Sequence, residues 1–505
     1  MGGEAGPAPV DLQVTDFVFV WARRLPDKAA IVHEGRPLSY GALAHRIAQA
    51  RAFFVRHGLI GPGVVVVAVA NLQTFWSLSL ALRSLGVTTI QPRPGQPLED
   101  LGLPEVLGVV GSPAERSLDL DQACATAGLP LLYAAIEAET PLWPTRAAPA
   151  GKTGGHILLT SGTTGLQKKV LMEPSFEPAY IRYRRRVMDI SHDSVGVLFD
   201  FAAWTGAGYK GVVSSLTAGA TVVIDQRPIS HAPLLYPGVT YAVILPSMVH
   251  ELLAGPPDAL PRNPALQIQV AAGALTLREI EALKARITPD LINSFGSTEV
   301  RPIAFTPMEI AEDQRWHRLV PDRGVQVVDD LDRPAPAGQV GRLRVPTTDG
   351  PTGYLNDETA TRAFFKDGYF YPGDLAEIRA DGRMALHGRV TDVINIKGQK
   401  ILPAPIEERL RDVLAVSGVC LFSMQNQAGE EEIHVVLETP SPISPAQLQE
   451  VLLRELTGFP GAHVHFVPAL PRNALGKVLR LAAREQALAA ARARAQLAAA
   501  PPPHV

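Results

Sequence analysis

The sequence predicts an α/β fold, in which a large N-terminal domain of α/β layers is followed by a smaller α+β domain at the C-terminus. Between residues 30 and 300, short runs of β-branched residues alternate with segments of helix-like composition, which is typical of α/β layers. After Gly388 the pattern changes to a compact region of about a hundred residues, which is the size of an independent domain.

The alternation can be followed element by element along the chain. The run of four valines at 64–67 predicts a buried strand, and a helix is expected after it over 74–85. Further strands are expected at 87–90, 157–159, 220–224, 241–245 and 267–271, and further helices at 247–253 and 277–287. The tail at 481–500 is dense in Ala, Arg and Gln, so it predicts a terminal helix that ends before Pro501.

Composition excludes several classes of protein. A chain of 505 residues with 46% hydrophobic and 19% charged residues is globular and too long for one average core. The net charge of -3 argues against a nucleic-acid binder, and Cys124 and Cys420 are too few for a disulfide framework or a cysteine-rich zinc site. No apolar stretch approaches the ~20 residues of a membrane span. The N-terminus lacks the pattern of a secretory signal, so we expect a cytoplasmic protein.

The stretch 159–170 contains the strongest local signal of function. It reads Leu-Thr-Ser-Gly-Thr-Thr-Gly-Leu-Gln-Lys-Lys-Val, so glycines and hydroxyl side chains precede Lys168 and Lys169. Glycines let backbone N–H groups approach an anion, and hydroxyls and an ammonium donate to its oxygens, so this stretch predicts a phosphate-binding loop. The Gly-Lys-Ser/Thr pattern of a kinase-type P-loop is absent. Taken alone, the stretch could equally be a turn.

Four further motifs join the loop in a pattern that resembles the adenylate-forming superfamily, which comprises acyl-CoA synthetases, peptide-synthetase adenylation domains and beetle luciferases. The five motifs occur in that family's order, at 160–170, 293–299, 371–374, 388–407 and 470–480. They are closest to those of acyl-CoA synthetases. The resemblance covers most of the chain.

The resemblance implies a nucleotide site for ATP. The β- and γ-phosphates would be held by the loop residues Thr160, Ser161, Gly162, Thr163, Thr164 and Gly165 together with Lys168. The adenine would lie beside Ala272, Gly273, Ala274, Asn293, Ser294, Phe295 and Gly296. Asp374 would accept hydrogen bonds from the ribose hydroxyls, assisted by Arg389. Asp374 could instead be a turn residue, and Arg389 a surface ion-pair partner.

The resemblance also implies the catalytic groups. Thr298 would contact the α-phosphate, and Glu299 would bind Mg²⁺, a hard cation suited to carboxylate oxygen. Lys477 would bridge the substrate carboxylate and the α-phosphate, where charge develops in the transition state. A lone Gly-Lys pair is usually a solvated loop, and only the surrounding Pro471, Gly476 and Arg480 favour the catalytic interpretation.

The acid pocket is expected to draw on Phe199, Asp200, Trp204, Thr205, Gly206 and Phe295. Aromatic rings there favour an apolar acyl or aryl channel, although plain core packing is an alternative. Asp200 resembles the aspartate with which peptide-synthetase domains hold an ammonium, so an amino acid is the second choice of substrate.

In this family a C-terminal domain rotates after adenylation. The matching division places the ATP and acid sites in residues 1–388 and a mobile domain in 389–505, with the pivot at Thr391 and the thiol-acceptor face at Lys397 and Gly398. The sequence departs from the family pattern at Gln167, Lys169, Thr391 and Pro405, which points to a divergent branch.

The sequence therefore predicts an enzyme that activates a carboxylic acid with ATP and Mg²⁺ and then forms a thioester with CoA. Transfer to an acyl carrier protein or an amine is the first alternative, and a non-catalytic nucleotide-binding relative is the second. His463 and His465 share one face of an expected strand, but the sequence offers no evident third ligand, so a metal site there is not expected.

Overall fold

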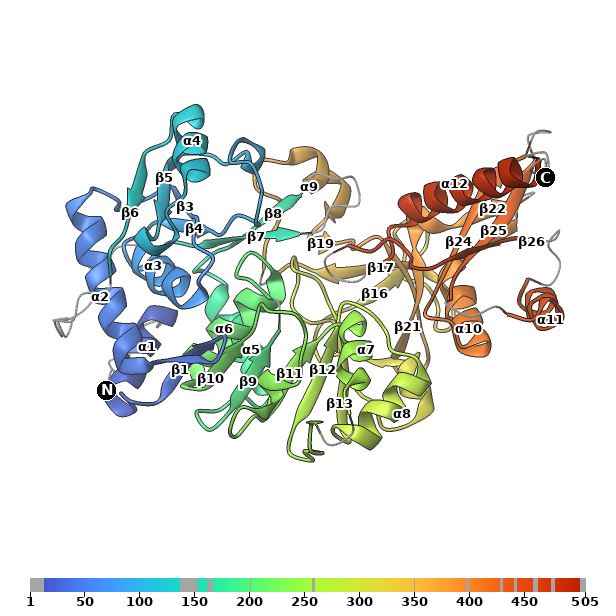
Figure 1. Ribbon diagram of the computed structural model, residues 1–505, viewed down its shortest axis with the longest axis horizontal. Helices are drawn as coiled ribbons and strands as arrows, with labels where there is room; N and C mark the ends of the chain where they lie inside the picture. The colour runs from blue at the N-terminus through green and yellow to red at the C-terminus, as the bar shows by residue number, and fades with distance from the viewer. Residues whose placement is uncertain are drawn as a thin grey trace, which may run out of the picture.

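The computed structural model describes residues 13–136, 153–160, 167–199, 201–256, 259–348, 350–396, 399–426, 430–439, 443–456, 462–473 and 477–499. In Figure 1 the elements up to β21 form the main body, and those from β22 to α12 gather at its right-hand end. The predicted α/β fold with a smaller C-terminal part is confirmed.

An eight-stranded sheet forms one half of the main body, in the order β14-β13-β12-β11-β9-β10-β1-β2. Its members are β1 (Ala29–His33), β2 (Arg36–Ser39), β9 (Val195–Leu198), β10 (Thr221–Ile224), β11 (Tyr241–Ile244), β12 (Gln267–Ala271), β13 (Asp290–Phe295) and β14 (Ala304–Pro307). The inner strands run parallel, and the edge strands β2 and β14 are antiparallel to their neighbours. The inner strands are mostly buried, which explains their continuous apolar runs.

A second sheet has the order β6-β5-β3-β4-β7-β8. Its members are β3 (Val64–Val67), β4 (Thr88–Ile90), β5 (Val106–Gly111), β6 (Leu131–Tyr133), β7 (His156–Thr160) and β8 (Lys168–Met172). β7 is parallel to β4 and antiparallel to β8, with Thr160 paired to Lys168. The stretch that predicts a phosphate loop therefore connects two adjacent strands.

Helices cover both sheets of the main body, as Figure 1 shows. They are α1 (Val14–Arg24), α2 (Tyr40–Arg56), α3 (Leu72–Ser84), α4 (Leu118–Ala127), α5 (Glu177–Val187), α6 (Gly206–Ala218), α7 (Pro246–Ala254), α8 (Leu277–Arg286) and α9 (Glu358–Phe364). Short 3-10 turns are η1 (Glu99–Leu101), η2 (Pro113–Glu115), η3 (Ala232–Leu235), η5 (Ala311–Gln314) and η6 (Val390–Asp392). Side-chain N-caps fix the first residue of several helices. Asn71, for example, accepts a hydrogen bond from Thr74 N at 3.0 Å at the start of α3.

A third, antiparallel sheet joins the two halves to the C-terminal part, and the sequence alternation did not predict it. It comprises β15 (His317–Arg318), β16 (Gln326–Val328), β17 (Gly341–Pro346), β18 (Phe365–Lys366), β19 (Tyr369–Phe370), β20 (Asp374–Ile378) and β21 (Arg383–Arg389). Four of its seven strands have only two or three residues, so no local period marks them. The sheet pairs Asp374 of β20 directly with Arg389 of β21.

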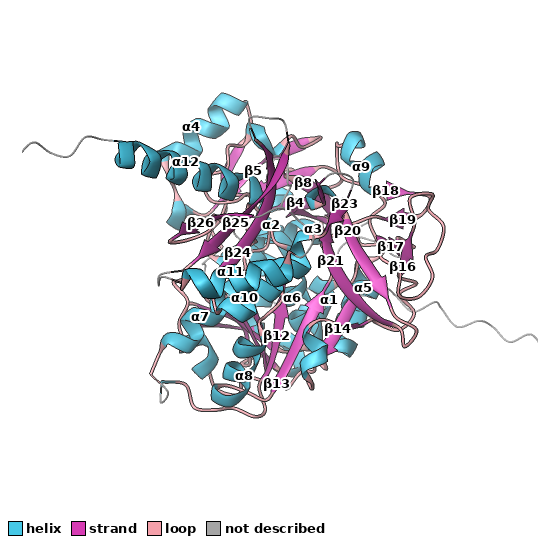
Figure 2. Ribbon diagram, turned by 90° about the vertical axis from the view of Figure 1, so that its right-hand side faces the viewer, coloured by secondary structure: helices cyan, strands magenta, loops and turns pink. Residues whose placement is uncertain are grey.

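The C-terminal elements are β22 (Ile394–Ile396), β23 (Gln399–Ile401), α10 (Pro403–Leu414), β24 (Gly418–Gln425), β25 (Glu431–Glu438), α11 (Pro445–Glu455), β26 (Ala462–Val467) and α12 (Arg480–Ala499). Figure 2 shows α10 and α12 beside the sheet β24-β25-β26. One apolar cluster joins this sheet to α10 and α11, and another joins it to Ala483 and Ala487 of α12. These clusters are separate from the core of the main body; the domain division at 388/389 remains a prediction.

A fully buried polar cluster stabilises the contact between the two large sheets. Arg83 of α3 donates from Nη2 to Glu177 of α5 at 2.6 Å, and Tyr209 of α6 hydrogen-bonds both residues. The side chains of Arg83 and Glu177 are 2% and 1% exposed. His156 stacks on Tyr209, and burial lowers the pKa of His156 to about 3, so its ring is neutral. Among the described residues no helix is long and apolar enough to cross a membrane.

Replacing Arg83 with Met should lower the free energy of unfolding by about 3–5 kcal/mol, because the buried carboxylate of Glu177 would lose its cation. Urea unfolding followed by circular dichroism measures the change. Arg362→Met is the matched control, because the Arg362–Glu358 pair is 80% and 83% exposed. Equal unfolding curves for the two variants would contradict this assignment.

Candidate active site

The residues predicted to surround the adenine lie at or just after the carboxyl ends of β12 and β13, where ligands bind in open α/β sheets. The two strands are parallel, with Ala271 paired to Ser294. Gln269 donates from Nε2 to Ser294 Oγ at 2.7 Å, and Ser294 donates onward to the Val270 carbonyl at 3.1 Å. Asn293 is 4% exposed, so its side chain belongs mainly to the sheet interior.

The turn after β12 is strained and tightly packed. Ala272 has a φ of 65°, in the left-handed region that a residue with a Cβ rarely adopts. A Cβ on Gly273 would lie 2.9 Å from Cγ of Pro246 at the start of α7. Only a glycine fits at 273, and the turn from Ala272 to Ala274 is held close to the end of β11.

The phosphate loop is described only at its two ends. Ser161, Gly162, Thr163, Thr164 and Gly165 lie outside the described residues. Thr160 and Lys168 face each other as register partners.

The Lys168 ammonium lies over two aromatic rings, 3.3 Å from the ring centre of Phe364 and 5.1 Å from that of Tyr354. Loss of hydration lowers its pKa, and the carboxylates of Glu299 and Asp357 act in the opposite direction.

Glu299 lies at the centre of the charged site. It is 7% exposed, and Oε1 accepts a hydrogen bond of 2.7 Å from the hydroxyl of Tyr354. Burial raises the pKa of Tyr354, and the negative charge of Glu299 raises it further, so the phenol keeps its proton and remains a donor. A carboxylate is a suitable hard ligand for Mg²⁺, which makes Glu299 the described residue that best fits this ion.

Thr298 is positioned from below by α6. The buried Lys210 of α6 donates from Nζ to the carbonyl of Thr298 at 3.1 Å. A Cβ on Gly206 would lie 2.8 Å from Oγ1 of Thr298, so the first residue of α6 must be glycine for the threonine to keep its place. Gly206, predicted for the acid pocket, therefore touches the residue predicted for the α-phosphate. A Cβ on Gly296 would meet Cα of Pro302 at 3.1 Å, so this turn is closely packed as well.

Asp374 and Arg389 form an ion pair across β20 and β21. Arg389 Nε is 3.0 Å from Asp374 Oδ1, and Arg389 also donates to the Pro372 carbonyl. Burial raises the pKa of Asp374, while the positive charges of Arg389 and Lys477 counteract the increase.

Lys477 approaches this ion pair from the C-terminal part. Its backbone N–H donates to Asn473 Oδ1 at 3.0 Å, and its carbonyl accepts from Asn473 N at 2.9 Å, so two hydrogen bonds fix its backbone before α12. Loss of hydration lowers the pKa of Lys477, Arg389 lowers it further, and Asp374 and Glu299 raise it. Although part of the side chain remains exposed, its ammonium lies within electrostatic reach of both carboxylates.

The residues predicted for the acid pocket are only partly available to a substrate. Phe199 is 2% exposed and packs in the core, which favours the packing alternative for that ring. Thr205 caps α6, because its Oγ1 accepts from Gly208 N at 3.0 Å and donates to the Ala202 carbonyl at 2.8 Å.

Two aromatic rings in the predicted acid pocket remain partly exposed. Trp204 is half-buried under Arg93, whose guanidinium is 5.0 Å from the ring centre. Phe295 is half-buried and stacks on His317. Asp200 lies outside the described residues.

The predicted pivot and acceptor face are less completely described. Thr391 lies in η6 and donates to Asp392 Oδ1 at 3.2 Å, while Lys397 and Gly398 lie outside the described residues. Pro405, where the sequence departs from the family pattern, is compatible with the helix, because it lies in the first turn of α10, where backbone N–H groups have no helical acceptor.

Three contacts of the site were not predicted from the sequence. Tyr354 is 55 residues from its partner Glu299, Lys210 is 88 residues from Thr298, and Phe364 lies under Lys168. No periodicity or local motif marks these residues, so only the three-dimensional pairing identifies them.

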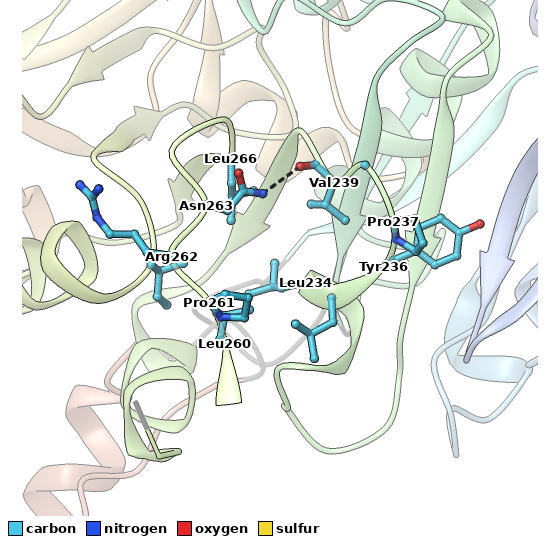
Figure 3. A pocket seen from close by; sticks show the side chains of 12 residues that line it. Leu234, Tyr236, Pro237, Val239, Leu260, Pro261, Arg262, Asn263 and Leu266 are labelled. Atoms are coloured by element: carbon cyan, nitrogen blue, oxygen red, sulfur yellow. Dashed lines mark hydrogen bonds between the residues drawn. The ribbon is translucent and has the colours of Figure 1, made fainter. Parts of the chain in front are cut away.

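A separate hollow in the main body, shown in Figure 3, lies away from these residues. Its lining includes Leu234, Tyr236, Val239, Leu260 and Asn263, from segments that precede β11 and β12. It therefore lies at the amino ends of the parallel strands, opposite the edge where the predicted site residues gather.

Comparison with known proteins agrees with the arrangement. Residues 116–355 match the family model described as "AMP-binding enzyme". The chain is 27% identical to a linear gramicidin synthase of Brevibacillus parabrevis, with 94% of this chain but only 10% of that protein covered. It is 27% identical to the salicyl-AMP ligase / salicyl-S-ArCP synthetase of Mycobacterium tuberculosis, with 90% and 87% covered.

Among solved structures, the O-succinylbenzoate coenzyme A synthetase of Bacillus subtilis in complex with AMP superposes with a TM-score of 0.76. Identity is 19%, with 92% of this chain and 97% of that chain covered, so this likeness establishes a shared fold. The family model, the relatives that match nearly the whole chain and the shared fold agree with one another. Residues 116–355 therefore match the AMP-binding enzyme family, and the chain as a whole shares its fold with that coenzyme A synthetase.

Proposed function

We propose that the protein activates a carboxylic acid with ATP to an acyl-adenylate and then transfers the acyl group to CoA. In the first step a carboxylate oxygen attacks the α-phosphorus of ATP, the bond to the β-phosphate breaks, and pyrophosphate leaves. In the second step the CoA sulfur attacks the acyl carbon, the bond to AMP breaks, and the thiol proton is released to solvent.

One observation carries this proposal: Lys477 of the C-terminal part lies within electrostatic range of Asp374, Arg389 and Glu299 of the main body. A protein that only binds a nucleotide, and catalyses no reaction, has little need for an ammonium from a segment so distant in sequence. An enzyme that joins a carboxylate to a phosphate must neutralise two anions, and a positioned ammonium does so where the transition-state charge develops.

The other charged residues of the site would each bind a different part of the nucleotide. Lys168 at the end of the loop would neutralise phosphate oxygens, and Asp374 would accept from the ribose hydroxyls in place of part of its contact with Arg389. Mg²⁺ held by Glu299 would supply further neutralisation of the phosphates. Tyr354 would keep the Glu299 carboxylate oriented through its 2.7 Å hydrogen bond.

The proposed acid is an aryl or apolar acyl acid. Trp204 and Phe295 offer half-buried rings, and a relative named for an aryl acid, the salicyl-AMP ligase, matches most of the chain. An amino acid is the second choice.

Transfer to a carrier protein is the alternative second step. The Mycobacterium tuberculosis relative is named as a salicyl-S-ArCP synthetase, and the Brevibacillus parabrevis relative is named as a gramicidin synthase. An amine is a further alternative acceptor. Rotation about Thr391 would have to present the face at Lys397 and Gly398 to either thiol.

A panel of aryl, aliphatic and amino acids, scored by pyrophosphate release, tests the first step. We expect release to depend on the acid and to be largest for an aryl or apolar acid, because the half-buried rings of Trp204 and Phe295 offer apolar contact. Thioester detection with CoA and with a phosphopantetheinylated carrier then separates the acceptors. Absence of acid-dependent release across the panel would favour a non-catalytic nucleotide-binding protein.

Replacing Lys477 with Ala should lower the rate of acid-dependent ATP–pyrophosphate exchange by about 10²- to 10³-fold, because a charge-stabilising donor is lost. Arg454→Ala is the control, since Arg454 is an exposed cation on α11 of the same C-terminal part. ATP binding, measured by calorimetry, should change far less than the rate. An unchanged exchange rate in Lys477→Ala would refute the role of this ammonium.

The pH profile should also depend on Lys477. Burial lowers its pKa below the ordinary 10.5, so the ammonium is lost as pH rises through that lowered value. We expect kcat/KM for ATP, which reports the free enzyme, to fall on the alkaline side below pH 10.5. In Lys477→Arg the limb should move to higher pH, because a guanidinium stays charged.

Lys168→Arg is the comparison for this profile, because the pKa of Lys168 is lowered too. An alkaline limb that moves in Lys168→Arg but stays in place in Lys477→Arg would assign it to the loop lysine instead.

A further inference from the structure

A cluster of imidazole and carboxylate groups lies in the C-terminal part, on the sheet face beside α12. Glu432 and His434 lie on β25, and His463 and His465 lie on the adjacent parallel strand β26. His434 is the register partner of His463, and alternation along each strand puts all four side chains on one face. The sequence showed the two β26 histidines but could not show which strand pairs with them.

The ligand atoms of three of these residues are already close together. One nitrogen or oxygen from each of Glu432, His434 and His463 lies within 4.8 Å of the others. Among the described residues, no other group of three or more His, Cys, Asp or Glu side chains is arranged so that it could hold an ion. Two of the three residues also contact each other directly, because His463 Nε2 lies 2.9 Å from Glu432 Oε2.

His434 provides the second, independent observation. It is 5% exposed, and its Nε2 is buried without a hydrogen-bond partner. A buried polar atom with no partner destabilises the folded state, so an unfilled ligand position is a physical explanation for it. Its other nitrogen, Nδ1, lies 2.9 Å from His465 Nε2, and its ring stacks on Phe422 at 5.1 Å.

The contact with His465 orients His434 as a metal ligand. If Nδ1 carries the proton and donates it to His465, Nε2 presents a lone pair, which is the usual arrangement of a metal-binding histidine and its outer partner. Burial, with the positive charges that His463 and His465 can carry, lowers the pKa of His434 to about 4.

We propose that Glu432, His434 and His463 bind one divalent transition-metal ion of the zinc class, with His465 orienting His434. Two imidazoles and one carboxylate suit zinc, whereas Mg²⁺ prefers oxygen ligands and would remain with Glu299 and the nucleotide phosphates. The ion would bridge β25 and β26 just before the segment that carries Lys477.

Ion binding needs only small movements. Ligand atoms of a tetrahedral zinc site with bonds of about 2.0–2.1 Å lie roughly 3.3 Å apart, so the group must contract by about 1.5 Å at most from its 4.8 Å spread. His463 and Glu432 are 55% and 32% exposed, so they can change rotamer while the buried His434 stays fixed. The hydrogen bond between His463 and Glu432 would be exchanged for two metal bonds.

The test is calorimetric titration of the full-length, tag-free protein with zinc chloride, after treatment with a chelator and in excess magnesium chloride. We expect one zinc ion per chain. His463→Asn and Glu432→Gln should each weaken binding at least ~10-fold. Because zinc binds the folded form, it should also raise the melting temperature of the wild type and not that of His463→Asn.

Two controls make the result specific. His192 lies 3.5 Å from Asp193 and is 54% exposed, so His192→Asn removes a similar exposed histidine–carboxylate pair that has no second imidazole. This variant and Glu299→Gln should bind zinc as the wild type does. Absence of a stoichiometric site, or an unchanged isotherm in His463→Asn, would overturn the proposal.

Discussion

The proposed chemistry depends on one electrostatic interaction, in which the Lys477 ammonium lies within range of the Asp374–Arg389 ion pair and of Glu299. Burial alone would neutralise an amine and a carboxyl group, and it does lower the pKa of Lys477 and raise that of Asp374. Each charge limits the shift of the other. The site thus holds an ammonium that is poorly hydrated but still has anionic neighbours. When substrates bind, the α-phosphate of ATP and the carboxylate of the acid could replace those neighbours.

The main body positions the groups that receive this lysine. Parallel strands end at a common edge, and the backbone there is packed so tightly that neither Gly273 in the turn after β12 nor Gly206 at the start of α6 has room for a side chain. Lys210 holds the backbone of Thr298 from beneath. These contacts fix the backbone before any substrate binds, so little binding energy is spent on ordering the site.

Local chemistry allowed much of this arrangement to be predicted. The valine run of β3, the apolar runs of β11 and β12 and the helix-forming tail of α12 follow from periodicity and propensity, which act over a few residues. Asp374, Arg389 and Lys477 were identified through motifs that resemble a family. The Tyr354–Glu299 hydrogen bond and the alignment of His434 with His463 could not be predicted, because they depend on pairing between distant segments. The strands β15, β16, β18 and β19 were missed because each has only two or three residues, too few to show a period.

Competitive labelling of lysines with an amine-reactive ester near neutral pH, read by mass spectrometry, tests the central contact most directly. A lysine with a lowered pKa has more free amine, so Lys477 should react faster than the exposed Lys400 and should be protected by ATP with Mg²⁺. Equal reaction of the two lysines, with no protection of Lys477 by the nucleotide, would contradict the account.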